Sequence, residues 1–228
     1  MNPLGPLAAL FVVVVGVGLP VLAWRSRHAF APDRAGPPVT PRDLYVSTVA
    51  VQVVTLLLAL WVAHDVGMPL LGGEFRVEPL VWAATAAVLG GLLATLPGRW
   101  RTRSPESRRR QALMAPRTPR QAALNVGLCL LAGIGEELVY RGVLHGCLWW
   151  ATGSWWLASA ACAVSFGVAH AIQGLRSMLI VAGVAVWLHA TVRWTGSLHL
   201  AMVAHVVYDL IATFTLARWV KRDELAAG

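Results

Sequence analysis

Two adjacent carboxylates and an arginine interrupt a long apolar stretch of the sequence. Glu136, Glu137 and Arg141 are the only acidic or basic residues of the Asp, Glu, Lys and Arg types within residues 122–151. Charged side chains in such a stretch are costly and usually mark a functional site. At helical spacing Glu137 and Arg141 share a face and can form an ion pair, whereas Glu136 points about 100° away. We therefore expect Glu136 to be the free carboxylate and the candidate general base.

Two histidines further along the chain each have a partner one helical turn away. Phe166 and His170 are four residues apart, and so are His205 and Asp209. A carboxylate one turn from a histidine fixes the tautomer and the orientation of the ring. We expect these side chains to converge with the glutamates. By contrast, we expect Gln52 to form a hydrogen bond between helices rather than to take part in chemistry.

The composition indicates the class of protein that must position these groups. The chain has 228 residues, of which 57% are hydrophobic and only 13% are charged, and its mean hydropathy is +0.62. Such a chain is too apolar for a water-soluble domain, which predicts an all-α, polytopic bundle of transmembrane helices. The net charge of +8 comes mostly from arginines between apolar segments, so we expect a bilayer and no nucleic acid as partner.

We expect about seven membrane spans in an integral, multi-pass protein of the plasma (inner) membrane. The spans are predicted at residues 4–24, 44–63, 79–96, 122–140, 155–171, 177–192 and 197–219. Eight arginines between residues 99 and 120 predict a cytoplasmic loop, or an interfacial segment held by anionic lipid headgroups. Alternating sides then place the N-terminus outside and the C-terminus, with Lys221 and Arg222, in the cytoplasm.

The expected depths of two candidate residues disagree. A helix that starts at Gln121 and rises 1.5 Å per residue places Glu136 about 22 Å from the inner face. His170 lies close to Gln173 and Arg176, and so much nearer that face. A tilted helix, a later helix start or a kink at the glycines before Glu136 is needed to bring the two together.

The three motifs, taken in order, resemble those of a known family. Glu136-Glu137-x-x-x-Arg141, Phe166-x-x-x-His170 and His205-x-x-x-Asp209 are similar to the motif set of the CPBP (CAAX protease and bacteriocin-processing, or Abi) family of intramembrane glutamate endopeptidases. The last position is commonly Asn in members that process prenylated proteins, and it is Asp209 here. This difference concerns the substrate class more than the fold.

The resemblance implies an intramembrane endopeptidase that acts on a membrane-associated protein or peptide. Glu136 with His170 would activate a water, and His205 would support the oxyanion while Asp209 orients the His205 ring. The supporting residues would be Glu137, Arg141 and Phe166. The domains expected are N-terminal transmembrane helices with a basic cytoplasmic loop (1–120), a CPBP-like catalytic core (121–220) and a short cytoplasmic tail (221–228).

The sequence is also compatible with three alternatives to a metal-independent peptidase. Glu136, His170 and His205 form a reasonable three-ligand zinc set with one open position, although no His-Glu-x-x-His pair is present and the resemblance favours a metal-independent mechanism. Carboxylates and histidines inside spans also mark ion or proton-coupled transporters. A catalytically silent immunity protein on the same scaffold is a third alternative.

Overall fold

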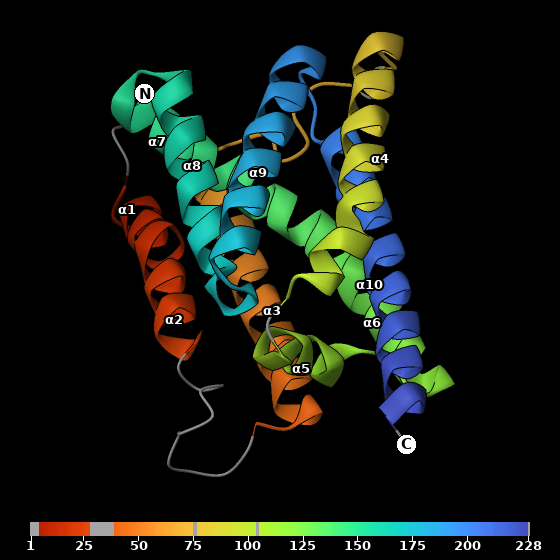
Figure 1. Ribbon diagram of the computed structural model, residues 1–228. Coiled ribbons are helices and arrows are strands. Elements are labelled where there is room, and N and C mark those ends of the chain that lie inside the picture. The colour runs from red at the N-terminus through yellow and green to blue at the C-terminus, as the bar shows by residue number, and fades with distance from the viewer. Residues whose placement is uncertain (1–4, 28–38, 75–76, 104, 228) are drawn as a thin grey trace.

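The computed structural model describes residues 5–27, 39–74, 77–103 and 105–227. Within these ranges the regular structure is helical, apart from one isolated β-bridge between Gly72 and Ser197. The prediction of an all-α polytopic bundle is confirmed (Figure 1). The elements are α1 (Pro6–Val13), the π-helix η1 (Val14–Gly18), α2 (Leu19–Ser26), α3 (Pro41–Asp65), α4 (Pro79–Arg101), α5 (Pro105–Met114), α6 (Pro119–Glu136), the π-helix η3 (Glu137–Leu144), α7 (His145–Thr152), α8 (Trp155–Ala169), the 3₁₀ turn η4 (Ala171–Gln173), α9 (Leu175–Thr195) and α10 (His199–Ala227).

Six helical runs are long and apolar enough to cross a membrane. They are Pro6–Ser26, Pro41–Asp65, Pro79–Arg101, Pro119–Thr152, Leu175–Thr195 and His199–Ala226. The remaining predicted span, the fifth in order at residues 155–171, is the shorter apolar helix α8, which has 15 residues and ends at Ala169. At 1.5 Å per residue α8 is about 22 Å long, less than the ~30 Å hydrocarbon core.

Local sequence signals explain where these helices begin. The Thr40 side chain accepts from the backbone N–H of Asp43 at 3.2 Å, and the Asp43 carboxylate accepts from the backbone N–H of Thr40 at 3.0 Å. This reciprocal capping box is followed by Pro41, whose missing N–H costs nothing in the first turn. At the start of α6 the Thr118 side chain accepts from the backbone N–H of Gln121, and Pro119 follows it.

The motif segment departs from a regular α-helix at the first catalytic candidates. α6 ends at Glu136 and continues directly as the wider π-helix η3, which holds Glu137 and Arg141. Figure 1 shows α6 and η3 crossing the bundle obliquely relative to α4. The oblique course of α6 agrees with the tilted helix that is needed to bring Glu136 toward the level of His170.

The largest buried core surrounds η3. Val139, Val143 and Leu144 of η3 are fully or almost fully buried and pack with Phe11 of α1 and Phe166 of α8. Cys129, Cys147 and Cys162 are buried free thiols. The motif segment is thus enclosed by the core rather than placed at its edge.

Candidate active site

Glu137 is the centre of a buried network of charged groups. Its Oε1 lies 3.1 Å from Nη1 of Arg141, and neither side chain is exposed to solvent (0% for both). The predicted ion pair is therefore present. The same Oε1 lies 2.7 Å from Nδ1 of His205, a contact that the sequence did not predict. The Arg141 guanidinium also lies over the Phe166 ring, 4.4 Å from its centroid, which links the first two motifs.

Glu136 has different surroundings from its neighbour. Its side chain is 16% exposed, its Oε1 accepts a hydrogen bond from Nε2 of Gln52, and its Oε2 lies 3.8 Å from Nε2 of His205. The expectation of a free carboxylate is wrong, because the amide of Gln52 reaches it from α3. Oε2 is nevertheless buried without a hydrogen-bond partner. One oxygen of Glu136 is thus anchored and the other remains available.

Gln52 is the residue that sequence reasoning missed. Its polar side chain in an apolar span predicts a hydrogen bond between helices, and it forms one. That hydrogen bond matters because its partner is Glu136, the candidate general base. A lone glutamine in a helix does not reveal which side chain of another helix it will meet, so no local signal pointed to Glu136.

His205 has carboxylates at both ring nitrogens. Nε2 lies 3.5 Å from Oδ2 of Asp209, which agrees with the predicted pair one turn apart. The closest carboxylate is Glu137 at Nδ1, however, so Glu137 rather than Asp209 is the primary anchor of the ring. This assignment leaves Nε2 directed toward Glu136 and Asp209.

His170 lies at the end of α8 and not within it. It is the C-terminal cap of that helix, and its Nδ1 lies 2.8 Å from the backbone carbonyl of Phe166. With a proton on Nδ1, the ring donates to that carbonyl and Nε2 keeps a free lone pair. His170 is close enough to Asp209 to interact electrostatically. Within the described ranges, no hydrogen bond or ion pair joins His170 directly to Glu136.

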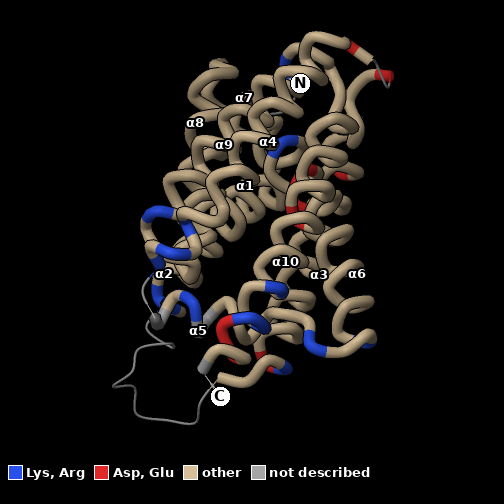
Figure 2. Tube along the Cα trace, turned by 45° about the vertical axis from the view of Figure 1, so that its right-hand side comes forward, with Lys and Arg blue, Asp and Glu red and all other residues tan. Residues whose placement is uncertain are grey.

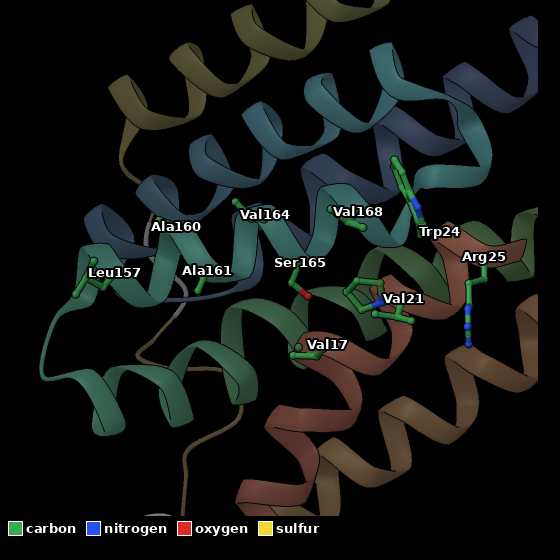
Figure 3. A pocket seen from close by; sticks show the side chains of 12 residues that line it. Val17, Val21, Trp24, Arg25, Leu157, Ala160, Ala161, Val164, Ser165 and Val168 are labelled. Carbon is green, nitrogen blue, oxygen red and sulfur yellow. The ribbon is translucent and has the colours of Figure 1, made fainter. Parts of the chain in front are cut away.

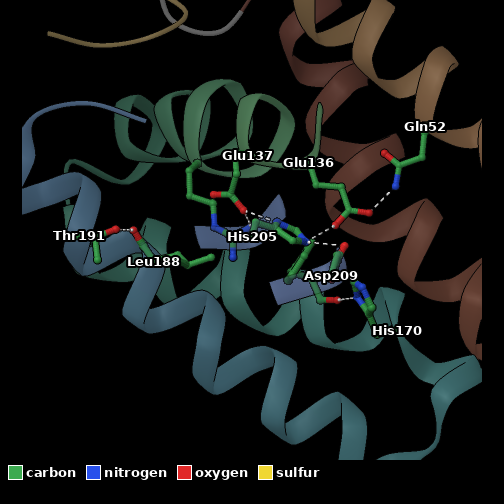
Figure 4. Close-up of polar contacts among 10 residues, drawn as sticks. Gln52, Glu136, Glu137, His170, Leu188, Thr191, His205 and Asp209 are labelled. Atoms are coloured by element: carbon green, nitrogen blue, oxygen red, sulfur yellow. Dashed lines mark hydrogen bonds and ion pairs between the residues drawn. The ribbon is translucent and has the colours of Figure 1, made fainter. Parts of the chain in front are cut away.

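Several elements that are distant in sequence meet at this point. Figure 4 shows the side chains of Gln52, Glu136, His170, His205 and Asp209 directed toward one region. The close approach of α6 and α10 depends on a small residue, because a Cβ added at Gly133 would lie 2.8 Å from the backbone nitrogen of Val206. Gly133 thus permits α10 to bring His205 against Glu137.

A metal ion is not supported by the arrangement of the ligand candidates. Among the residues that the structure describes, no group of three or more His, Cys, Asp or Glu side chains is placed to hold one. Glu136, His170 and His205 therefore do not form a ready three-ligand set as they stand. Dependence on zinc stays an untested prediction.

An apolar groove of about 740 Å³ lies between α2 and α8 (Figure 3). It is lined by Val17 and Val21 on one side and by Val164 and Val168 of α8 on the other, with Trp24 and Arg25 at one end. None of the candidate catalytic side chains lines it. The groove is therefore separate from the polar site.

Comparison with known proteins gives a match for the segment that carries the motifs. Residues 118–211 match the family model described as Rce1-like, type II CAAX prenyl endopeptidase Rce1-like. Neither the curated proteins nor the solved structures give a match. The matched segment contains the three motifs and all the candidate catalytic residues from Glu136 to Asp209. This match supports the assignment of the segment to the CAAX protease (CPBP) family.

Proposed function

We propose that this protein hydrolyses a peptide bond of a membrane-associated protein or peptide, with Glu136 as the general base. The observation that carries this proposal is the buried Oε2 of Glu136, which has no hydrogen-bond partner and faces the ring of His205. A carboxylate that is held at one oxygen and open at the other is suited to take a proton from a bound water. The family match supports the reaction class. Residues 121–220 would form the catalytic core.

In this mechanism Glu136 and His170 hold the attacking water between them. The water oxygen attacks the carbonyl carbon of the scissile bond, Glu136 receives the proton, and the same proton later passes to the leaving nitrogen. His205, protonated at both ring nitrogens in this role, keeps Nδ1–H on Glu137 and donates Nε2–H to the oxyanion that forms. The Nδ1 contact with Glu137 holds the ring in place, and Asp209 orients it from the other side.

The decisive test is Glu136→Gln in the purified full chain. The amide keeps the size of the side chain but removes the base, so we expect normal folding and a rate lower by about 2 to 4 orders of magnitude. His170→Ala should fall to a similar level, and the double variant should lose little more, because groups that act as one unit are not additive. Cleavage of a membrane-associated substrate added to the purified protein, followed by mass, is the measurement.

Two controls separate this proposal from its alternatives. Glu137→Gln should reduce thermal stability first, since it disrupts the network around Arg141 and His205. Chelator and added zinc on the same sample test the metal-dependent alternative. Parent-like cleavage by Glu136→Gln would refute the assignment of the base. Proton-coupled flux into proteoliposomes that Glu136→Gln abolishes would favour a transporter.

A further inference from the structure

Three arginines gather where α4 ends and α9 begins, and we call them the arginine cluster. Arg99 lies in the last turn of α4, Arg103 lies two residues beyond that helix, and Arg176 is the second residue of α9. Arg99 is only 8% exposed, and its Nη1 donates to the hydroxyl of Tyr208 at 3.2 Å. Arg176 donates from Nη1 to Oγ1 of Thr102 at 2.9 Å, which joins α9 to the end of α4.

Arg103 is the member of the cluster with unused hydrogen-bonding capacity. Its Nη1 is buried and has no hydrogen-bond partner. Burial, together with repulsion from Arg99 and Arg176, lowers the pKa of Arg103 to about 10. The guanidinium thus stays charged at neutral pH in a place where its charge is poorly compensated. Such a group is a candidate partner for a ligand with negative charge.

Among the side chains that the structure describes, the surroundings of the cluster supply little compensating negative charge. None of the described groups that act on Arg103 is a carboxylate. Asp223, which accepts from Nε1 of Trp100 at 3.0 Å, also lies 3.8 Å from Nη2 of Arg222. The C-terminal dipole of α4 favours Arg99, but Arg176 lies in the first turn of α9, where the helix dipole disfavours a cation. That turn has no acidic residue and no side-chain cap.

We propose that the arginine cluster binds a phosphate oxyanion, supplied by the headgroup of an anionic phospholipid or by free phosphate. Guanidinium groups match the geometry of phosphate oxygens and bind them through paired hydrogen bonds. Figure 2 shows that Lys and Arg concentrate at the end of the bundle that holds α5 and the C-terminus. An anionic leaflet is attracted to such an end. The site is distinct from the polar network at Glu136, and the proposal does not rest on peptidase activity.

The test is thermal unfolding of the full chain in neutral detergent, with phosphatidylglycerol titrated against phosphatidylcholine. We expect phosphatidylglycerol to raise the melting temperature and phosphatidylcholine to leave it unchanged. In Arg103→Gln the half-effective concentration should rise about fivefold, as one lost charge contact near a lipid surface implies. Arg176→Gln, at an exposed position, should raise the half-effective concentration by a similar factor. It replaces Arg103→Gln as the test variant if Arg103→Gln folds poorly. Arg120→Gln removes an equal charge from an exposed side chain of α6 and should behave as the parent.

Two further measurements are the melting temperature without any anion and the melting temperature with inorganic phosphate alone. Without any anion, Arg103→Gln should melt no lower than the parent, because the change removes a repelled guanidinium; an arginine with a purely structural role would give a lower value. Stabilisation by inorganic phosphate alone, lost in the same variants, would identify the free anion as the ligand and still support the site. The proposal is overturned if neither anion stabilises the parent, or if both stabilise parent, Arg103→Gln and Arg176→Gln equally.

Discussion

Glu136 and Glu137 are neighbours in the chain, yet their environments assign them different tasks. Glu137 is completely buried, and its Oε1 is shared by Arg141 and His205. Glu136 is partly exposed and keeps one oxygen open. Oε2 of both carboxylates lacks a hydrogen-bond partner, but Glu137 is fully enclosed and its charge is compensated by Arg141 and His205, whereas Glu136 is partly exposed and can accept a proton. The difference arises because successive residues of a helix point about 100° apart.

Arg141 is expected to act through stability. In Arg141→Ala the carboxylate of Glu137 loses its buried countercharge, which typically costs about 3–5 kcal/mol. We expect a lower melting temperature and a lower folded yield in detergent, together with lower activity. Glu137→Gln combined with Arg141→Met removes both charges and should recover part of the stability. A single Arg141→Ala variant that melts with the parent would show that the pair contributes nothing.

Gln52 is expected to act as a positioning residue for Glu136. Gln52→Met keeps the length of the side chain but removes the amide that donates to Oε1. A hydrogen bond to a charged group contributes about 1.5–3 kcal/mol, so kcat should fall at least about tenfold. KM and the melting temperature should change little. The comparison is Asn125→Ala, which removes a contact between α6 and Tyr45 about 16 Å along the helix from Glu136.

A loss of kcat in both variants in proportion to stability would assign Gln52 a structural role only. A loss confined to Gln52→Met would place the amide in the catalytic unit. Gln52→Asn, whose shorter side chain cannot reach Glu136 in the same way, should resemble Gln52→Met.

At the scale of elements, the sequence predicted local relations better than distant ones. The pairs Glu137–Arg141 and His205–Asp209 follow from spacing on one helix, and both are present. The contacts of His205 with Glu137 and of Gln52 with Glu136 join residues 68 and 84 positions apart. They depend on how helices cross, which no single segment encodes. Family resemblance named the motif residues, but the primary anchor of His205 emerged only from packing.

The sequence also did not predict that α8 is short or that residues 137–144 form the π-helix η3. Apolar composition continues past Ala169, so hydropathy extends the span to residue 171, whereas the chain turns at His170. A widened turn leaves no mark in the apolar pattern around Glu137. Both irregular features occur at candidate catalytic residues, where departures from regular structure are often found.

The contact between α6 and α10 gives a test at this scale. Gly133→Ala places a methyl group 2.8 Å from the backbone nitrogen of Val206, so the two helices must separate. We expect an overpacking cost of about 1–3 kcal/mol and a larger loss of activity, because His205 follows α10 away from Glu137. Thermal unfolding and cleavage rate are the measurements.

Gly127→Ala is the matched control for that change. It lies on the same helix, and a Cβ there meets nothing within 4 Å. Replacing glycine by alanine within a helix is intrinsically favourable by up to about 1 kcal/mol, so this variant should be as stable as the parent or more stable. Equal behaviour of the two variants would mean that the close approach at Gly133 does not position the site.

At the scale of the whole molecule, charge and helix direction give one consistent arrangement. α1 begins at the end of the bundle opposite to the C-terminus, and Lys and Arg concentrate near the latter (Figure 2). If α8 is counted as a membrane crossing, the loop between α3 and α4 lies on the same side of the membrane as the turn between α9 and α10. The bridge between Gly72 and Ser197 joins those two segments directly. From the positive-inside rule we expect the basic end to face the cytoplasm.

This arrangement predicts a cytoplasmic C-terminus and an extracytoplasmic N-terminus. A fluorescent protein fused after Gly228 should therefore fluoresce, and alkaline phosphatase fused there should be inactive, because the first folds in the cytoplasm and the second requires export. Phosphatase inserted after Gly73, in the loop between α3 and α4, should be active and provides the internal control. Active phosphatase at Gly228 together with inactive phosphatase at Gly73 would invert the topology. The arginine cluster would then face the exterior, and the candidate site would have to receive its substrate from the other side of the membrane.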